Sequence, residues 1–194
     1  MNLILASQSP RRKELLKLAG FTFEIKVTDA DESINPSWNI IKVPEILARK
    51  KAALVVEKFG FGNESVVVAA DTVVVFENKI FNKPANEIEA IQMLEMLNGK
   101  EHLVVTGICV KNGSKEEIFN DCTKVFFNKL TYEELEFYVK NYSPLDKAGA
   151  YGIQDWIGLR IVKKIEGCYF NVMGLPVSKL VFSLKKYGIT GFTG

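Results

Sequence analysis

The segment from Val66 to Phe76 has the most distinctive pattern of hydrophobic and polar positions in the chain. It is apolar on both faces and rich in β-branched valine, which is typical of a strand covered on both sides. Asp71 and Thr72 interrupt this pattern. A carboxylate that leaves water is costly unless it meets a cation, a metal or several donors. Asp71 is therefore either a structural hydrogen-bond anchor or a chemical group, and the pattern alone does not decide which.

The N-terminal segment predicts a strand, a tight polar loop and a helix. The strand is Asn2 to Ala6, Ser9 suits the N-cap, Pro10 suits the first helical position, and Gly20 suits the end of the helix. Such a loop presents backbone N–H groups and the positive end of the helix dipole, which favours phosphate. An ordinary capped helix with solvated arginines is the alternative. The polar side chains of the loop are those of Ser7, Ser9, Arg11 and Arg12.

The next segment predicts a second strand, Phe21 to Thr28, followed by an acidic loop with Asp29, Asp31 and Glu32. These carboxylates could hold a divalent cation or remain solvated, and the solvated state is favoured unless the fold brings Asp71 nearby. A helix from Pro44 to Phe59 follows, with a basic cluster at residues 49–51. We expect most of that cluster to be solvated.

A turn at Glu77-Asn78 leads to a short strand at residues 79–81. Lys83 follows, just before the rigid Pro84, which is a good position from which to aim an ammonium group at a fixed anion. Further along, the segment 146–154 contains two glycines and small residues. It predicts a loop that lets another molecule approach its backbone closely.

Several further elements follow from turn and capping signals. We predict a hairpin of 101–111 and 114–128 through Asn112-Gly113, and another of 159–165 and 168–172 through Glu166-Gly167. We predict a helix from the capping box of Asn86 and Glu89 to Leu97. A second helix begins at the capping box of Thr131 and Glu134, and its apolar side carries Leu135, Tyr138, Val139 and Tyr142. A third helix is predicted at 176–187, followed by a frayed tail at 189–194.

The length and composition favour an ordinary globular protein without independent domains. The 194 residues suffice for one generous domain or two intimate lobes, and a net charge of +2 without a basic stripe argues against nucleic acid. No apolar run approaches the roughly 18 residues that a membrane span requires, and arginines come too early for a signal peptide. We therefore expect a cytoplasmic protein with no membrane partner.

The cysteines and the single histidine do not form the pattern of a cysteine or histidine metal site. Cys109, Cys122 and Cys168 have neither metal-ligand spacing nor an even number, so buried thiols are expected. His102 cannot build a histidine metal site by itself. It follows Gly99 in a predicted helix-to-strand connection, which favours a structural role.

Five motifs stand in order along the chain: Leu-Ala-Ser-Gln-Ser-Pro-Arg-Arg (5–12), Ala-Ala-Asp-Thr-Val-Val (69–74), Asn-Lys-Pro (82–84), Asp-Lys-Ala-Gly-Ala-Tyr-Gly-Ile-Gln (146–154) and Met-Gly-Leu-Pro (173–176). Together they resemble the Maf family of nucleoside triphosphate pyrophosphatases, from Leu3 to about Leu184. The resemblance implies an α/β fold with an elongated mixed β-sheet flanked by helices, and two lobes with a central cleft, as in inosine triphosphatase-like enzymes. It also implies hydrolysis of a nucleoside triphosphate to monophosphate and pyrophosphate with Mg²⁺ or Mn²⁺.

The resemblance also implies roles for individual residues. Asp71 matches the family's proposed proton acceptor and, with Glu32, would hold the metal. Arg11, Thr72 and Gln154 match positions tied to base preference, and this set is similar to the dTTP/UTP subgroup. The remaining cleft positions are Ser7, Ser9, Arg12, Lys51 and Lys83, of which the two lysines suit phosphate. The segment 154–158, Gln-Asp-Trp-Ile-Gly, departs from the Gln-Gly of close relatives.

The expected function is therefore house-cleaning hydrolysis of dTTP, UTP or modified pyrimidine nucleotides. Cleavage between the α- and β-phosphates requires an anion clamp, a metal and a carboxylate that activates water. The alternative is a nucleotide-responsive regulator that inhibits septum formation and turns over little or no substrate. The expected partner is the nucleoside triphosphate, and a homodimer is left open.

Overall fold

The computed structural model describes residues 1–192. The chain forms two compact units. Unit 1 comprises Met1–Asp71, Thr106–Asp121 and the chain from Gly174 on. Unit 2 comprises Thr72–Val105 and Cys122–Met173. The elements are β1 (Asn2–Leu5), α1 (Pro10–Leu18), β2 (Glu24–Ile25), η1 (Ile40–Lys42), α2 (Val43–Phe59), β3 (Ser65–Phe76), β4 (Lys79–Phe81), α3 (Glu87–Leu97), β5 (Glu101–Asn112), β6 (Lys115–Phe127), α4 (Tyr132–Tyr142), η2 (Pro144–Asp146), η3 (Ala148–Ala150), α5 (Trp156–Ile161), β7 (Val162–Glu166), α6 (Tyr169–Val172) and α7 (Val177–Lys185).

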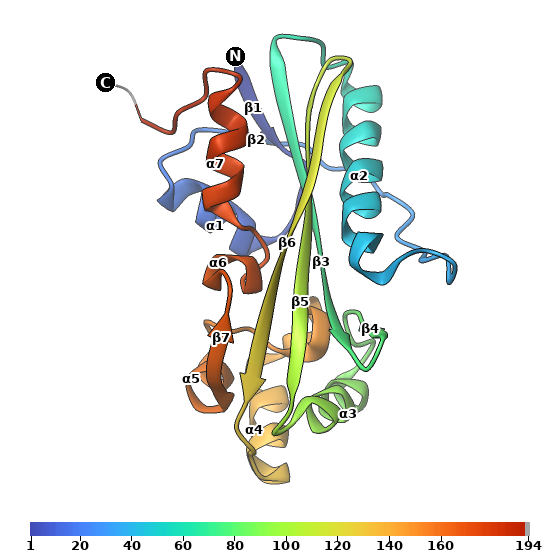
Figure 1. The fold of residues 1–194 in the computed structure, drawn as a ribbon, viewed down its shortest axis with the longest axis vertical. Coiled ribbons are helices and arrows are strands. Elements are labelled where there is room, and N and C mark those ends of the chain that lie inside the picture. The colour runs from blue at the N-terminus through green and yellow to red at the C-terminus, as the bar shows by residue number, and fades with distance from the viewer. Residues whose placement is uncertain (193–194) are drawn as a thin grey trace. The chain divides into compact units, whose positions relative to one another are not determined.

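Within residues 1–192 the strands form one seven-stranded sheet of order β2-β1-β3-β5-β6-β7, with β4 paired to β3 (Figure 1). β1 runs parallel to β2 and β3, whereas β4 and β7 run antiparallel to β3 and β6. The predicted mixed α/β fold is therefore confirmed. None of the helices in the described part is long and apolar enough to cross a membrane.

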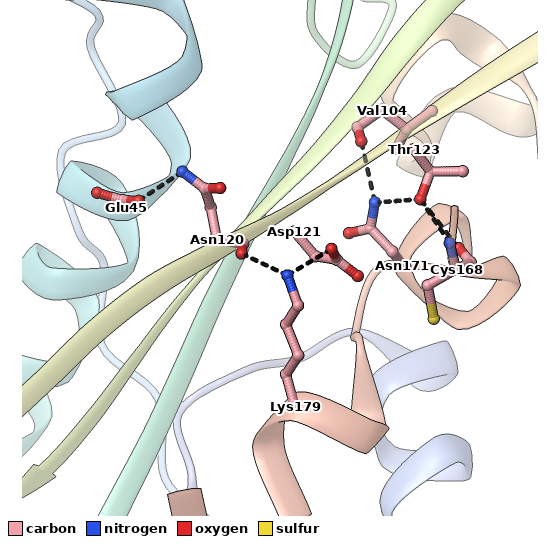
Figure 2. A network of polar contacts seen from close by, with 8 residues as sticks. All are labelled: Glu45, Val104, Asn120, Asp121, Thr123, Cys168, Asn171 and Lys179. Carbon is pink, nitrogen blue, oxygen red and sulfur yellow. Dashed lines mark hydrogen bonds and ion pairs between the residues drawn. The ribbon is translucent and has the colours of Figure 1, made fainter. Parts of the chain in front are cut away.

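In unit 1, helix α2 covers one face of the sheet, and α1 and α7 lie on the other (Figure 1). Alternation along β6 shows this directly: Asn120 donates to Glu45 of α2 at 2.5 Å, while the next residue, Asp121, pairs with Lys179 of α7 at 2.6 Å (Figure 2). A Cβ at Gly107 of β5 would fall on the backbone of Pro44. Glycine there lets the start of α2 lie against the sheet. The buried core on the α2 face consists of Ile4, Ala6, Ala48, Ala52, Val55, Val67, Ala69 and Cys109.

In unit 2, helices α3, α4 and α5 supply most of the helical core. Asn171 of α6 ties this unit together, because its Nδ2 donates to Val104 O of β5 at 3.0 Å and to Thr123 Oγ1 of β6 at 2.9 Å (Figure 2). The Thr123 hydroxyl in turn donates to Cys168 O at 3.1 Å. The largest buried helical side chains are Leu94, Leu97, Leu135, Tyr138, Ile157 and Ile161.

The predicted final hairpin of 159–165 and 168–172 is wrong. Residues 156–161 form α5 and 169–172 form α6, while β7 pairs with β6 instead. Ile157 and Ile161 are both fully buried one helical turn apart, which is the spacing of a helix face. A short apolar run does not by itself distinguish this from a strand.

Other boundaries also differ from prediction. The strand predicted at 21–28 is reduced to β2, and the β5–β6 turn is Gly113-Ser114 rather than Asn112-Gly113. The N-cap of Asn86 is confirmed, but Glu89 accepts from Ala85 N, so the reciprocal bond of a capping box goes one residue earlier. The capping box of Thr131 and Glu134 is confirmed, although Tyr142 of that helix's apolar side is 42% exposed.

The predicted frayed tail is wrong for the part that the structure describes. Ile189 N donates to Leu184 O, and Gly191 lies against Phe21. Residues 193–194 of that prediction lie outside the described residues. The helix predicted at 176–187 is confirmed as α7.

The predictions for cysteine and histidine also need correction. None of the three cysteines, all in the described part, is in a disulfide, but only Cys109 is buried; Cys122 is exposed and Cys168 is intermediate. His102 lies in β5 rather than in a connection. Its structural role holds, because its ring packs against Phe127 and Tyr151 and only 3% of it is exposed.

Candidate active site

Asp71 lies on the α2 face of β3. Side chains alternate along a strand, so Asp71 shares a face with Val67 and Ala69, which pack in the core under α2. Only 8% of Asp71 is exposed. Lys51 of α2 lies three residues after Ala48 on the same helix face, and its Nζ is 2.6 Å from Asp71 Oδ1. Asp71 thus meets the cation that a buried carboxylate requires.

Glu32 reaches the same ammonium group from the acidic loop. Its Oε1 is 2.9 Å from Lys51 Nζ. Two carboxylates therefore converge on one cation, although 50% of the Glu32 side chain is exposed and only 11% of the Asp71 side chain is. Asp31 does not join them: its carboxylate accepts from Ser33 and is 4.0 Å from Lys50. The fold thus selects Glu32 from the acidic loop.

Arg12 connects the N-terminal loop to the strand that carries Asp71. Its Nη1 donates to Ala70 O at 2.8 Å and to Ser7 Oγ at 3.2 Å, and its Nε donates to Gly174 O at 2.8 Å. Burial lowers the pKa of the Arg12 guanidinium, and the negative charge of Asp71 raises it. Arginine remains charged at neutral pH in proteins, so Arg12 adds a fixed positive charge near Asp71.

The polar loop differs from a simple phosphate cradle. Ser9 occupies the N-cap of α1, yet within the described residues its side chain makes no capping hydrogen bond. The Ser9 N–H donates instead to the buried Ser7 Oγ at 3.2 Å. One backbone donor that the sequence suggested for an anion is therefore used inside the loop.

The other three predicted residues belong to unit 2. Thr72 follows Asp71 in β3 and is half-buried, Lys83 is exposed after β4, and Gln154 is exposed just before α5. Unit 1 holds Ser7, Ser9, Arg11, Arg12, Glu32, Lys51 and Asp71, of which the structure directly joins Glu32, Lys51 and Asp71 through ion pairs and Ser7, Ser9 and Arg12 through hydrogen bonds.

Sequence reasoning missed two residues next to Gln154. Asp155 Oδ1 accepts from Gln154 Nε2 at 3.0 Å, and Asp155 Oδ2 accepts from the Tyr138 hydroxyl at 3.0 Å. The signal in the sequence is Asp155 itself, which departs from the Gln-Gly of relatives. Tyr138 lies on helix α4, 17 residues before Asp155, so the local sequence pattern around Gln154 could not predict their contact.

Asp71 and Glu32 of unit 1 are the candidate ligands for a divalent cation. Among residues 1–192 no group of three or more His, Cys, Asp or Glu side chains could hold a metal alone. Mg²⁺, however, is commonly held by one or two carboxylates together with substrate phosphates and water. Asp71 and Glu32, which already share one cation, fit that requirement. The donor set is oxygen only, which suits Mg²⁺ or Mn²⁺.

Comparison with known proteins gives extensive similarity. Residues 2–187 match the family described as Maf-like protein. A protein of Cytophaga hutchinsonii named dTTP/UTP pyrophosphatase is 44% identical over 95% of this chain and 84% of its own length. One of the same name from Geobacillus is 46% identical over 96% of this chain and 98% of its own.

Among solved structures, the Ham1 protein of Staphylococcus aureus aligns with a TM-score of 0.48 at 12% identity, covering 66% of this chain and 72% of that one. A TM-score at this level supports no inference about this chain. The family match and the sequence relatives, by contrast, each span nearly its full length. The chain therefore belongs to the Maf family of proteins.

Proposed function

We propose that this chain is a nucleoside triphosphate pyrophosphatase that hydrolyses dTTP and UTP, and modified pyrimidine triphosphates, to the monophosphate and pyrophosphate. The observation that carries the proposal is the buried Asp71, which with Glu32 holds one cationic group at the end of an apolar strand segment. Membership of the Maf family and relatives named dTTP/UTP pyrophosphatase support it.

Asp71 is the group that accepts a proton from water in this proposal. A carboxylate must be within hydrogen-bonding reach of the water and must not be permanently neutralised. In the structure Lys51 holds Asp71 Oδ1 at 2.6 Å. When the triphosphate binds, its negative charge competes for the ammonium group of Lys51. The lysine then contacts phosphate, and Asp71 becomes available to orient and deprotonate water.

Asp71 and Glu32 would hold the divalent cation. Such a cation, when bound, neutralises charge on the phosphate oxygens and stabilises the developing charge of the transition state. Lys51 occupies the same pair of carboxylates in the resting structure. Lys51 would have to release these carboxylate oxygens before they could hold a cation.

The remaining residues divide into an anion clamp and a base-reading set. In unit 1 the proposed phosphate ligands are Ser7, Ser9, Arg12 and Lys51, with Arg12 also fixing the loop to Ala70 O and Gly174 O. In unit 2 the proposed phosphate ligand is Lys83. Bidentate arginine donors and lysine point charges are the usual phosphate ligands. The base-reading set is Arg11, Thr72 and Gln154.

The proposed cellular setting is the cytoplasm, and the proposed role is house-cleaning of the nucleotide pool. A homodimer is also proposed, which sedimentation analysis would test.

The alternative is a nucleotide-responsive regulator of septum formation with little or no turnover. A sensor requires the anion clamp but no carboxylate that activates water. The placement of Asp71 beside Lys51 favours the enzyme, because a solely structural carboxylate would not need a second, exposed carboxylate on the same cation.

Product analysis tests the proposal. The purified chain is incubated with dTTP, UTP, CTP, ATP and GTP in the presence of Mg²⁺ or Mn²⁺, and the products are separated. Pyrophosphate with the monophosphate, fastest from dTTP and UTP, is expected. Orthophosphate as the product, or no product from any nucleotide, contradicts the proposed reaction. A parallel incubation with EDTA tests the metal requirement separately.

A further inference from the structure

Asp155 occupies the N-cap of α5 but does not cap it. Aspartate at this position usually accepts a hydrogen bond from an N–H of the first helical turn. In α5, which lies wholly within the described residues, no such side-chain bond is made. The two carboxylate oxygens face other side chains: Gln154 Nε2 donates to Oδ1, while the Tyr138 hydroxyl donates to Oδ2 and Lys147 Nζ is 3.6 Å from Oδ2.

The contact with Asp155 determines the positions of the NH₂ group and the carbonyl oxygen of the Gln154 amide. An ionised carboxylate accepts hydrogen bonds and donates none, so the part of the Gln154 amide beside it must be the NH₂ group. The carbonyl oxygen, Oε1, is then the part that remains to face a ligand. An exposed glutamine without such a neighbour could present either group.

Asp155 is itself held firmly. Tyr138 is fully buried, and its hydroxyl accepts from Gly152 N at 3.2 Å while donating to Asp155. Burial raises the pKa of Tyr138 and the nearby Asp155 raises it further, so the hydroxyl stays protonated and remains a donor. The direction of every hydrogen bond from Gly152 to Gln154 is thus fixed.

Gly152 supplies the space for this arrangement. A Cβ at that position would lie 2.5 Å from Asp155 Oδ2 and 2.8 Å from Gln154 Nε2. Both distances are below van der Waals contact. Any larger residue would displace one of the two side chains, so the Gln154–Asp155 pair depends on glycine at position 152.

We infer that Asp155 is a positioning residue that fixes Gln154 with its Oε1 toward the base, so that the site accepts a hydrogen bond from a ring N–H. The inference rests on the proposed function, in which Gln154 reads the base. Uracil and thymine carry an N–H at ring position 3, whereas cytosine has a bare nitrogen acceptor there. Two acceptors face each other when cytosine binds, and an unpaired polar group of this kind is costly. Asp155 thereby selects uracil and thymine over cytosine.

The test uses Asp155→Asn in the full chain. Asparagine keeps the shape, but when its one oxygen accepts from Tyr138, its NH₂ group faces Gln154. The Gln154 amide then has to turn over and present its own NH₂ group to the base. We expect the ratio of kcat/KM for UTP to that for CTP to fall about 10-fold, chiefly because CTP improves. The control is Glu136→Gln, which removes an exposed ion pair with Lys140 on the same helix as Tyr138. It should leave the ratio unchanged.

A second measurement separates this inference from the proposed function. Binding of the non-hydrolysable α,β-methylene analogues of UTP and CTP is measured by calorimetry on the wild type and on both variants. A wild-type preference for the UTP analogue that Asp155→Asn removes supports the inference, even if no triphosphate is hydrolysed and the proposed function fails.

Two results overturn the inference. One is a wild type that binds both analogues equally. The other is an Asp155→Asn protein that loses thermal stability or activity equally with both nucleotides and keeps the ratio, as a purely structural role predicts. If Asp155→Asn does not fold, Tyr138→Phe releases one oxygen of Asp155 and should lower the same ratio by a smaller factor. An unchanged ratio there counts equally against the inference.

Discussion

The two units of the chain hold their key carboxylates in contrasting ways. In unit 1, Asp71 is held by the ammonium group of Lys51, which Glu32 shares. In unit 2, Asp155 is held mainly by the neutral donors of Tyr138 and Gln154. A cluster of charges can respond to a multiply charged ligand, because ions exchange partners. Hydrogen bonds from neutral donors instead fix direction, which suits recognition of one base edge over another.

The largest effect should come from removing the charge of Asp71. Asp71→Asn keeps the shape but accepts no proton from water, so kcat should fall about 10²-fold or more while triphosphate affinity stays within about an order of magnitude. Turnover, nucleotide affinity and melting temperature are measured on one preparation. Asp31→Asn, on the acidic loop but not on Lys51, is the matched control and should behave as wild type.

If Asp71 is instead a structural anchor, the order of effects reverses. Asp71→Asn would lose stability by a few kcal/mol, as expected for a disrupted buried polar network, and its folded fraction would turn over normally. That outcome would remove the contrast between a reactive cluster in unit 1 and a directional one in unit 2.

The next effect concerns the cation of the same cluster. Lys51→Gln removes the group that holds both carboxylates, and kcat/KM for dTTP should fall about 10-fold, since a phosphate contact is lost as well. The neighbouring Lys50→Gln is the control, because the contacts of Lys50 are with other residues. Its Nζ lies 5.1 Å from the Trp38 ring centroid and 4.0 Å from the carboxylate of the exposed Asp31. Equal losses in the two variants would mean that α2 carries only a diffuse positive field.

A smaller effect should appear in the pH dependence of unfolding. Burial lowers the pKa of His102 from 6.5 to about 3. Below pH 6.5 the unfolded chain therefore binds a proton that the folded chain does not, and His102 should reduce stability as pH falls, by about 1.4 kcal/mol per pH unit at most. This loss ends near pH 3, where the folded state also binds the proton.

Urea unfolding of wild type and His102→Gln at pH 8, 6 and 5 measures this contribution. The comparison at pH 8 gives the cost of the substitution itself, and the variant should show a smaller decline between pH 6 and pH 5. Identical declines would indicate that the His102–Tyr151 pair, 2.8 Å apart, opens to water on protonation without loss of the fold.

The smallest effect is expected at Gly152. Gly152→Ala should push back the side-chain ends of Gln154 and Asp155 and should lower the UTP-to-CTP ratio about threefold, equivalent to less than about 1 kcal/mol. The kcat for UTP and the melting temperature should change little. A large loss of stability instead would show that the backbone of Gly152, rather than the two side chains, yields to the added methyl group.

Much of the fold could be read from the sequence, because local chemistry determines local structure. The valines of β3, the Pro10 start of α1 and the caps at Asn86 and Thr131 all predicted their elements correctly. The segment 156–172 could not be read in this way. Its apolar runs are short. Pairing of β7 with β6, which lies far earlier in the sequence, decides which of these residues form a strand and which form helices.

The candidate site shows the same division. Asp71 stood out in the sequence because a carboxylate in an apolar strand requires a partner, but the sequence offered three adjacent basic residues, at positions 49–51 of α2, and three carboxylates in the acidic loop. Only the tertiary structure selected Lys51 and Glu32. The sequence likewise contained Gln154 and Asp155 side by side, whereas the buried hydroxyl of Tyr138 on another helix determined what Asp155 does. A pattern records which groups need partners, and the packing of distant segments decides which partners they meet.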